Sequence, residues 1–174
     1  MNRKAIGVAQ VFIFILAAIS FALIMIFGYK AINGFLQGGQ QVEFIQFKTD
    51  FETSIQRIYT EYGAVRIEQF HAPVQYTKIC FVNLDTLADS ALETEDPLAF
   101  AAWESAHGSY KNIDENAFLT PSAPVKIKVH NIQIDSVEGK NYLCLPINDG
   151  TFSLRLEGKG SYTQLSRVVP GQNE

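Results

Sequence analysis

A long uncharged run near the amino terminus constrains this chain more than any other feature. From Ala5 to Tyr29 the sequence has no charged residue, and only Gln10 and Ser20 are clearly polar. As a helix, the run would be roughly 35 Å long, whereas the apolar core of a bilayer is about 30 Å thick. A helix also satisfies its backbone hydrogen bonds internally, which the lipid interior requires. We therefore expect residues 5–29 to form one transmembrane helix.

Two other interpretations of this run remain. It could be the buried core helix of a soluble protein, although such helices are rarely this long without a charge. It could also be a cleaved secretory signal, because Ser20-Phe21-Ala22 fits the small-x-small rule for cleavage. Cleavage there would leave the apolar residues 23–27 at the new amino terminus, so the anchor is favoured.

The charges around the run predict its orientation. Arg3 and Lys4 precede it, and basic residues favour the cytoplasmic side of a membrane. Lys30 follows it and acts in the opposite direction. We expect a single-pass protein of the cell membrane with a short cytoplasmic leader, residues 1–4, and an extracytoplasmic domain.

The amino-terminal region resembles type IV pilin-like proteins, especially archaeal ones with a class III signal peptide. The matching features are the short basic leader MNRK, the small residue Ala5 after it, and the uncharged run. The chain departs from the pattern at Ala9, where pilins often carry a glutamate, and Gln10 follows it. The resemblance covers about 30 to 60 residues.

This resemblance implies processing and assembly. The peptidase of that family would cut between Lys4 and Ala5, and the apolar helix would stay on the mature protein. Such helices associate in a filament core or remain in the membrane beforehand. The implied partners are the lipid bilayer and copies of the same chain or other membrane proteins, bound through the amino-terminal helix. Small residues that would allow close helix approach are Ala9, Ala17, Ala18 and Ala22.

Residues 30–41 are rich in glycine and predict a flexible joint near Gly38-Gly39, since each glycine costs a helix about 1 kcal/mol relative to alanine. A second, amphipathic helix should follow and end at Gly63. Aromatic and aliphatic residues share one face of it at spacings of three and four: Phe44, Phe47, Phe51, Ile55, Ile58 and Tyr62. We favour packing of this face on the protein's own sheet over a short coiled coil.

From Ala64 onward the hydrophobic period changes to two, which is typical of strands. The segments expected as strands are the alternating residues after Ala64, then Thr77–Leu84, Val125–Val129 with Ile132 and Ile134, Asn141–Ile147, Thr151–Leu156 and Tyr162–Val168. Asp149-Gly150 suits the positive φ angles of a type I′ hairpin turn. The sequence therefore predicts an antiparallel sheet of about five or six strands within an α+β domain, residues 42–169, followed by a disordered tail, residues 170–174.

The stretch from Asp85 to Pro124 differs and is expected to be an insertion, partly helical. Asp96 is a suitable N-cap and Pro97 a suitable first helical residue. Asp85, Asp89, Glu93, Glu95 and Asp96 form an acidic cluster without a basic residue. The cluster could bind calcium, but it lacks the glycine of a calcium-binding loop, so a solvated acidic loop is favoured.

Charge excludes one class of partner. Of the 14 basic residues, Arg3, Lys4 and Lys30 flank the apolar run, which leaves 11 basic against 18 acidic residues from Ala31 onward, a balance of −7. Binding to nucleic acid requires clustered Lys and Arg. We expect no nucleic-acid partner.

Cys80 and Cys144 are the two cysteines, and both fall in expected core strands. In an extracytoplasmic domain they could form a disulfide. Two buried thiols that act as small apolar side chains fit the pattern equally well.

No arrangement of residues predicts catalysis, a cofactor or a metal. His71, His107 and His130 have neither a ligand spacing between them nor a neighbouring cysteine. The sequence thus leaves three functions in order: a pilin-like or pseudopilin-like surface subunit, a permanently anchored binding or accessory module of a secretion or envelope complex, and an anchored enzyme of unknown reaction.

Overall fold

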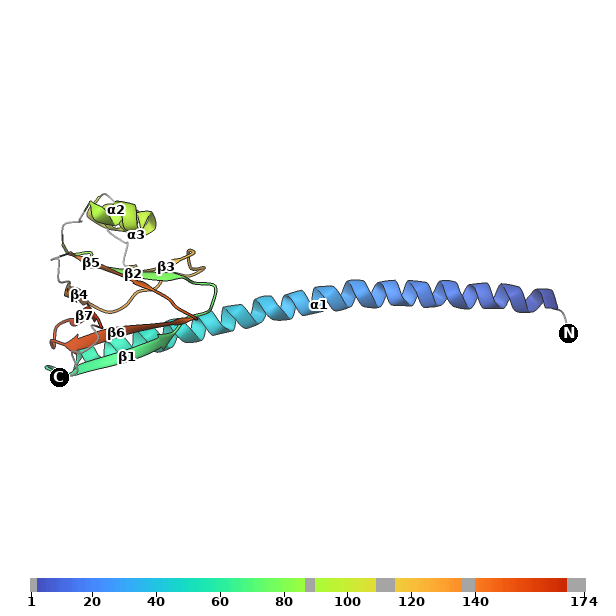
Figure 1. Ribbon diagram of the computed structural model, residues 1–174, viewed down its shortest axis with the longest axis horizontal. Helices are drawn as coiled ribbons and strands as arrows, with labels where there is room; N and C mark the ends of the chain where they lie inside the picture. The colour runs from blue at the N-terminus through green and yellow to red at the C-terminus, as the bar shows by residue number, and fades with distance from the viewer. Residues whose placement is uncertain (1–2, 87–89, 109–114, 136–139, 169–174) are drawn as a thin grey trace. The chain divides into compact units, whose positions relative to one another are not determined.

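The computed structural model describes residues 3–86, 90–108, 115–135 and 140–168 (Figure 1). The chain forms two compact units, Met1–Val42 and Glu43–Glu174, here called unit 1 and unit 2. The expected tail, residues 170–174, lies outside the described residues.

One helix, α1 (Arg3–Tyr59), belongs to both units. The sequence predicts two helices with a break between them, but the helical backbone continues through Gly28, Gly34 and Gly39. A glycine weakens a helix without forbidding it, because the penalty of about 1 kcal/mol is small beside that of a proline. The predicted break between two helices is therefore wrong. Flexibility of residues 30–41 stays a prediction.

The described residues of unit 2 form seven strands in two sheets. The four-stranded sheet has the order β1 (Val65–His71), β6 (Thr151–Gly158), β7 (Thr163–Arg167) and β4 (Ile132–Asp135). The three-stranded sheet has the order β3 (Ala117–Thr120), β2 (Lys78–Val82) and β5 (Tyr142–Pro146). The α+β class is confirmed, but the single antiparallel sheet is wrong, because β4 and β7 run parallel.

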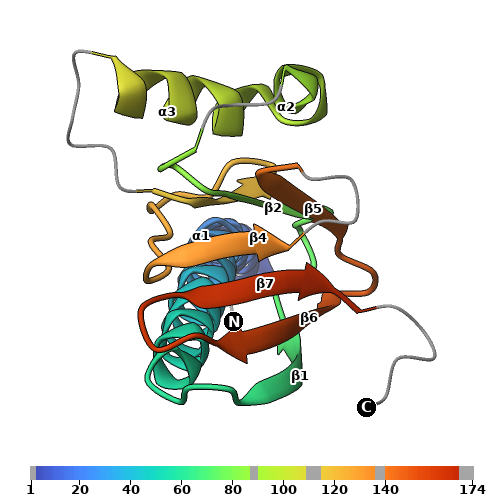
Figure 2. The same ribbon diagram turned by 90° about the vertical axis from the view of Figure 1, so that its left-hand side faces the viewer.

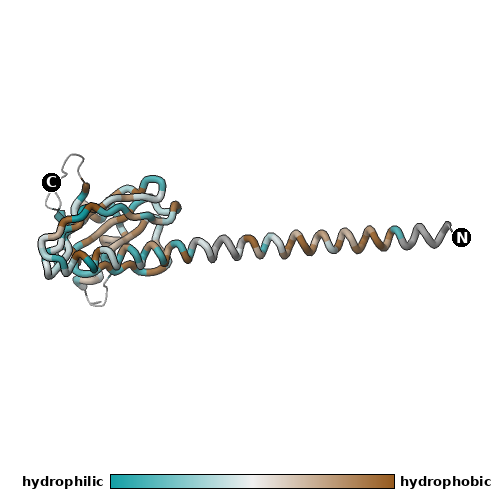
Figure 3. Tube along the Cα trace, turned by 90° about the horizontal axis from the view of Figure 1, so that it is seen from below, coloured by the Kyte–Doolittle hydropathy of each residue, from teal (hydrophilic) through white to brown (hydrophobic). Residues whose placement is uncertain are grey.

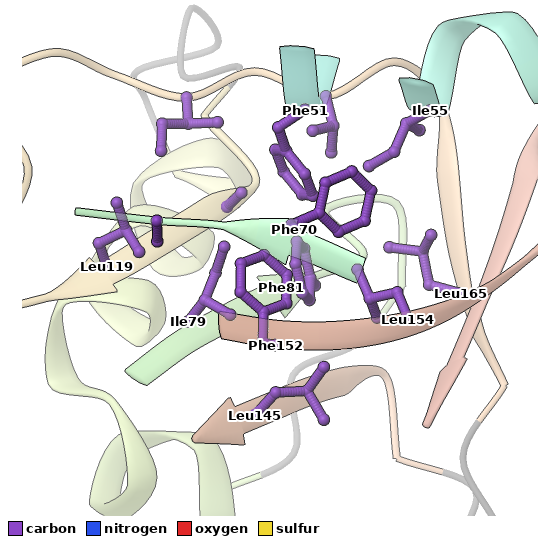
Figure 4. Close-up of a cluster of buried hydrophobic side chains, with 14 of the residues drawn as sticks. Phe51, Ile55, Phe70, Ile79, Phe81, Leu119, Leu145, Phe152, Leu154 and Leu165 are labelled. Carbon is purple, nitrogen blue, oxygen red and sulfur yellow. The ribbon is translucent and has the colours of Figure 1, made fainter. Parts of the chain in front are cut away.

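The main core lies where the second part of α1 meets both sheets (Figure 4). The buried residues that α1 contributes to it are Phe44, Phe47, Phe51, Ile55 and Ile58. Packing of the amphipathic face on the protein's own sheets is therefore confirmed. Phe51 lies at the centre, because its ring centroid is 4.8 Å from that of Phe70 and 5.7 Å from that of Phe81.

A second core lies on the other face of the three-stranded sheet, under α2 (Ala91–Glu95) and α3 (Pro97–His107) (Figure 2). Alternate residues of β2 point to the two cores: Ile79 and Phe81 to the main core, Cys80 and Val82 to the second one. Burial on both faces explains why this strand is a continuous apolar run.

Local chemistry starts α3 as the sequence predicts, and Asp149-Gly150 turns the chain between β5 and β6. The expected hairpin is wrong, because β5 and β6 lie in different sheets and only the isolated bridge Asn148–Thr151 joins the two sides of the turn. Asp96 Oδ1 accepts hydrogen bonds from the backbone N–H groups of Leu98 and Ala99, each at 3.1 Å. Asp149 and Gly150 have φ angles of 49° and 72°. A Cβ on Gly150 would lie 2.9 Å from the carbonyl oxygen of Ala72, so glycine is required there.

Three details of the strands and helix differ from expectation. Val125 is exposed and belongs to no strand, while Ile127, on the buried side, forms an isolated bridge to Ala117 of β3, a strand that the sequence pattern missed. Val65 and Ile67 face solvent. Tyr62 is 83% exposed because α1 ends at Tyr59, before the next turn could carry Tyr62 to the core face.

Candidate functional site

The apolar part of unit 1 is one candidate site. Within the described residues, Gln10–Ile32 is the one helical segment long and apolar enough to cross a membrane. Its large side chains are exposed, with Phe14 at 65% and Ile24 at 69%. Figure 3 shows a largely hydrophobic stretch along this part of α1. Exposed apolar surface of this extent is unfavourable in water and indicates a lipid or protein environment. The side chains of Lys4 and Ala5, the expected processing site, lie outside the described part.

The second candidate site is the solvent-facing side of α1 in unit 2. Opposite the core, the helix presents exposed residues without charge, here called the outer face of α1: Ile45, Gln46, Thr49, Thr53 and Gln56. Surface helices usually carry their charges opposite the core. Positions 46, 49, 53 and 56 are three and four residues apart, which is the spacing of a helix–helix seam.

Charged residues of this part of α1 lie on either side of the outer face, and several of them contact other segments of unit 2. Lys48 Nζ lies 2.9 Å from Glu52 Oε1, and that oxygen also accepts the backbone N–H of Lys128 at 3.0 Å. On the other flank, Arg57 pairs with Glu68 of β1 at 3.4 Å, and the Ser54 hydroxyl donates to the same carboxylate. Charge still borders the outer face, because Glu43 and Asp50 are exposed at three and four residues from Gln46.

The outer face also has a polar group that is already satisfied. Thr49 Oγ1 donates to the carbonyl oxygen of Ile45 at 2.9 Å, a hydrogen bond within the helix. A hydroxyl bonded in this way loses less when a partner displaces water from it. Covering the Thr49 hydroxyl would therefore cost little.

The structure brings Cys80 and Cys144 together as a disulfide. The residues are directly opposite in the antiparallel pair β2–β5, with a Cα–Cα distance of 4.0 Å. Cys80 is fully buried in the second core, beneath α3. Both cysteines are bonded, so the described residues contain no free thiol.

The histidines and acids are not brought together. His71 is exposed on β1, the His107 ring stacks on Trp103 at 4.3 Å, and the His130 ring meets Tyr59 edge-on at 4.3 Å. Within the described residues no group of three or more His, Cys, Asp or Glu side chains could hold a metal ion.

The acidic cluster separates in the structure. Asp96 is buried as the cap of α3, whereas Asp85, Glu93 and Glu95 are exposed. Asp89 lies outside the described residues. The carboxylate of Glu95 lies 3.9 Å from Lys78 Nζ, a contact that sequence distance did not reveal.

Sequence reasoning missed the outer face of α1. Its signal is present in the sequence as uncharged residues at spacings of three and four, on the side opposite the phenylalanines. Threonine and glutamine give no hydrophobic signal in the sequence. Their lack of charge becomes informative only when the structure shows which face of the helix is buried.

Comparisons with protein-family models, with curated protein sequences and with solved structures found no match to this chain.

Proposed function

We propose that this protein is a single-pass, membrane-anchored surface subunit, pilin-like or pseudopilin-like, that associates with copies of itself through α1. In this proposal unit 1 resides in the bilayer, and unit 2 is the extracytoplasmic domain. The amino terminus is cytoplasmic, and the prepilin-type cut falls between Lys4 and Ala5.

The observation that supports assembly best is the uncharged outer face of α1. A helix that faced only water would gain solubility from charge there, and α1 instead presents an uncharged strip bordered by the exposed residues Asp50 and Arg57. Thr53, at the middle of the face, is exposed and is flanked along the helix by Thr49 and Gln56. A second α1 presents the same uncharged strip, so the five residues of the strip would bring no like charges together.

The disulfide supports an extracytoplasmic place for unit 2. Disulfides persist in oxidising compartments and are rare in the cytosol. Cys80–Cys144 closes a separation of 64 residues and ties together the two strands that carry the second core. The basic residues Arg3 and Lys4 independently favour a cytoplasmic amino terminus.

The alternative function is a permanently anchored binding or accessory module. It uses the same anchor and domain, but it keeps residues 1–4 and does not assemble through α1. An anchored enzyme of unknown reaction is the third candidate.

Intact mass and amino-terminal analysis of the protein from its native membranes separates the first two functions. The proposed subunit begins at Ala5, and mechanical shearing of cells releases it with filaments. A chain that begins at Met1 or Asn2, and that stays with the membrane after shearing, contradicts the proposal and favours the permanently anchored module.

A further inference from the structure

The helix α3 has an exposed side, here called the α3 surface. Its residues are Pro97, Leu98, Ala101 and Glu104, and all four are exposed. Leu98 is 55% exposed, whereas Ala99 on the opposite side of the helix is fully buried in the second core. An exposed leucine beside a proline and an alanine makes the α3 surface apolar at its amino-terminal end.

Acids surround the α3 surface. Residues 79–110 contain six acids and neither Lys nor Arg. Glu104 lies on the surface itself, and Glu93 is exposed on α2. Asp85 is exposed in the loop that Trp103 Nε1 holds to α3, through a hydrogen bond of 2.7 Å to the carbonyl oxygen of the next residue. An apolar side chain among carboxylates suits a partner that offers an aliphatic side chain and basic groups.

Unit 2 also carries a surface of the opposite charge, on the segment that follows the loop after β3. Ile127 and Val129 of this segment are buried in the main core. The exposed residues beside them, here called the basic segment, are Val125, Lys126, Lys128 and His130. Val125 is 51% exposed, and residues 116–134 contain no acid. Each of the two surfaces thus offers one large exposed aliphatic side chain and charges of one sign.

The two surfaces lie on different sides of the three-stranded sheet. Figure 2 shows α3 on one side of this sheet and α1 on the other. The basic segment packs beside α1, because the backbone N–H of Lys128 donates to Glu52 Oε1 at 3.0 Å. The His130 ring also meets the ring of Tyr59 of α1 edge-on. The sheet therefore separates the acids around α3 from the lysines of the same chain, and a second copy can bring them together.

We infer that the α3 surface of one copy binds the basic segment of a second copy, with Leu98 against Val125 and the acids around α3 against Lys126 and Lys128. The occupant is a second copy, because the chain itself supplies the complementary charge and aliphatic side chain for each surface. The two surfaces differ, so the contact is heterologous and can repeat into a row of copies.

Individual ion pairs on a surface contribute little, so this contact needs copies that are held close together. An anchor in one membrane supplies that closeness by raising the effective concentration of unit 2. The inference therefore rests on the anchor of the proposed function. It goes beyond association through the outer face of α1, because it uses other residues.

Disulfide cross-linking of the full chain in native membranes tests the contact. Cys80 and Cys144 are bonded to each other, so introduced cysteines provide the free thiols. Leu98→Cys and Val125→Cys are placed on two co-expressed copies with different tags. With a mild oxidant they should form a dimer that carries both tags, whereas either variant expressed alone should stay largely monomeric. In the matched control Tyr62→Cys replaces Val125→Cys, because Tyr62 is also exposed, at 83%.

Charge reversal tests the basis of the contact. Lys126→Glu with Lys128→Glu, on the copy that carries Val125→Cys, should lower the cross-linked fraction by roughly tenfold, because like charges would then meet. Glu93→Lys with Glu104→Lys on the other copy should restore most of it. Restoration would also show that the reversed copies are folded.

Cross-linking equal to that of the control pair overturns the contact, as does cross-linking that charge reversal leaves unchanged. A loss that the compensating lysines do not restore overturns it as well. Leu98→Cys that links to position 98 of a second copy, or to a different protein, assigns another occupant and also overturns it. Dimers from Thr53→Cys in parallel samples, without a dimer between positions 98 and 125, overturn this contact and leave the proposed function standing. Protein absent from the membrane fraction overturns both the contact and the anchor.

Discussion

At the scale of single residues, Phe51 joins the elements of unit 2. Its ring contacts Phe47 of α1, Phe70 of β1, Phe81 of β2 and Phe152 of β6, with centroid distances from 4.8 to 6.0 Å. The side chain is fully buried. This one residue therefore connects α1 to both sheets. Its helical spacing predicts that Phe51 is buried, but not which strands it contacts.

Phe51→Ala should destabilise unit 2 by about 3–5 kcal/mol, because it removes buried aromatic surface and leaves a cavity between two sheets. Denaturant unfolding followed by circular dichroism measures the change. Ile45→Ala, on the outer face of α1, is the control and should cost less than about 1 kcal/mol. Equal losses for the two variants would mean that the core is not centred on Phe51.

Glu157 gives a pH-dependent contribution to stability. The hydrogen bond from Lys159 is the main cause that lowers the pKa of Glu157, with charge contributions from Lys159 and Arg155. A carboxyl with a lower pKa in the folded state stabilises the fold at pH values above its unfolded pKa, near 4.5. That contribution is lost as the pH falls through the folded pKa.

Glu157→Gln should therefore lower the free energy of unfolding at neutral pH by at most about 1 kcal/mol, since the pair is partly exposed. The difference from the original chain should disappear in acid. Urea unfolding at a series of pH values measures both. A difference that stays constant from neutral to acid pH would exclude a role for the ionised carboxylate.

At the scale of elements, the sequence predicts what is local. The core face of α1, the Asp96 cap and the Asp149-Gly150 turn follow from residues within a few positions of each other, and all three are present. Long-range pairing is not encoded locally. The parallel pair β4–β7 joins Ile132 to Thr163, and no short pattern in either strand indicates the other.

The alternation of apolar and charged residues in a strand does not by itself predict which of its faces is buried. In β1 the pattern Val-Arg-Ile-Glu indicates that Val65 and Ile67 face the core. The structure reverses this, because Arg66 and Glu68 turn toward α1 and pair with Glu61 and Arg57. Inward charge on an edge strand discourages pairing with other chains, which is a reason for the reversal.

The disulfide should stabilise unit 2 mainly by restricting the unfolded chain. For a loop of 64 residues the chain-entropy model gives roughly 4 kcal/mol. We expect the double variant Cys80→Ala, Cys144→Ala to lose about this amount in denaturant unfolding under non-reducing conditions. Chemical reduction of the original chain should give a similar loss. No loss in either measurement would indicate that the two sulfurs are not bonded in the protein.

The glycine-rich part of α1 gives a prediction about stiffness. A Cβ on Gly39 would meet no atom within 4 Å, and the backbone there is helical. Gly39→Ala should stabilise the local helix by about 1 kcal/mol and slow hydrogen exchange of neighbouring amides. Gly63→Ala is the contrast, because φ is 78° there and alanine should destabilise the turn. Unchanged exchange in the first variant would argue against a joint at residues 30–41.

At the scale of the whole molecule, three parts of the chain bear on its place in the cell. The segment Gln10–Ile32 suits a bilayer, the outer face of α1 suits a second helix, and the disulfide suits an oxidising compartment. The first could be predicted from the sequence as an apolar run, whereas the sequence left open whether Cys80 and Cys144 are bonded. The second depends on which side of α1 the sheets cover, and that is decided by contacts between distant segments.

Association through the outer face of α1 is the central claim, and cysteine cross-linking in native membranes tests it most directly. Thr53→Cys places a thiol at the middle of the outer face, and Gln69→Cys places one at an exposed site of β1. With a mild oxidant, the account predicts cross-linked dimers from position 53 and a largely monomeric chain from position 69. Monomeric chain at position 53, or equal cross-linking at both positions, would contradict it.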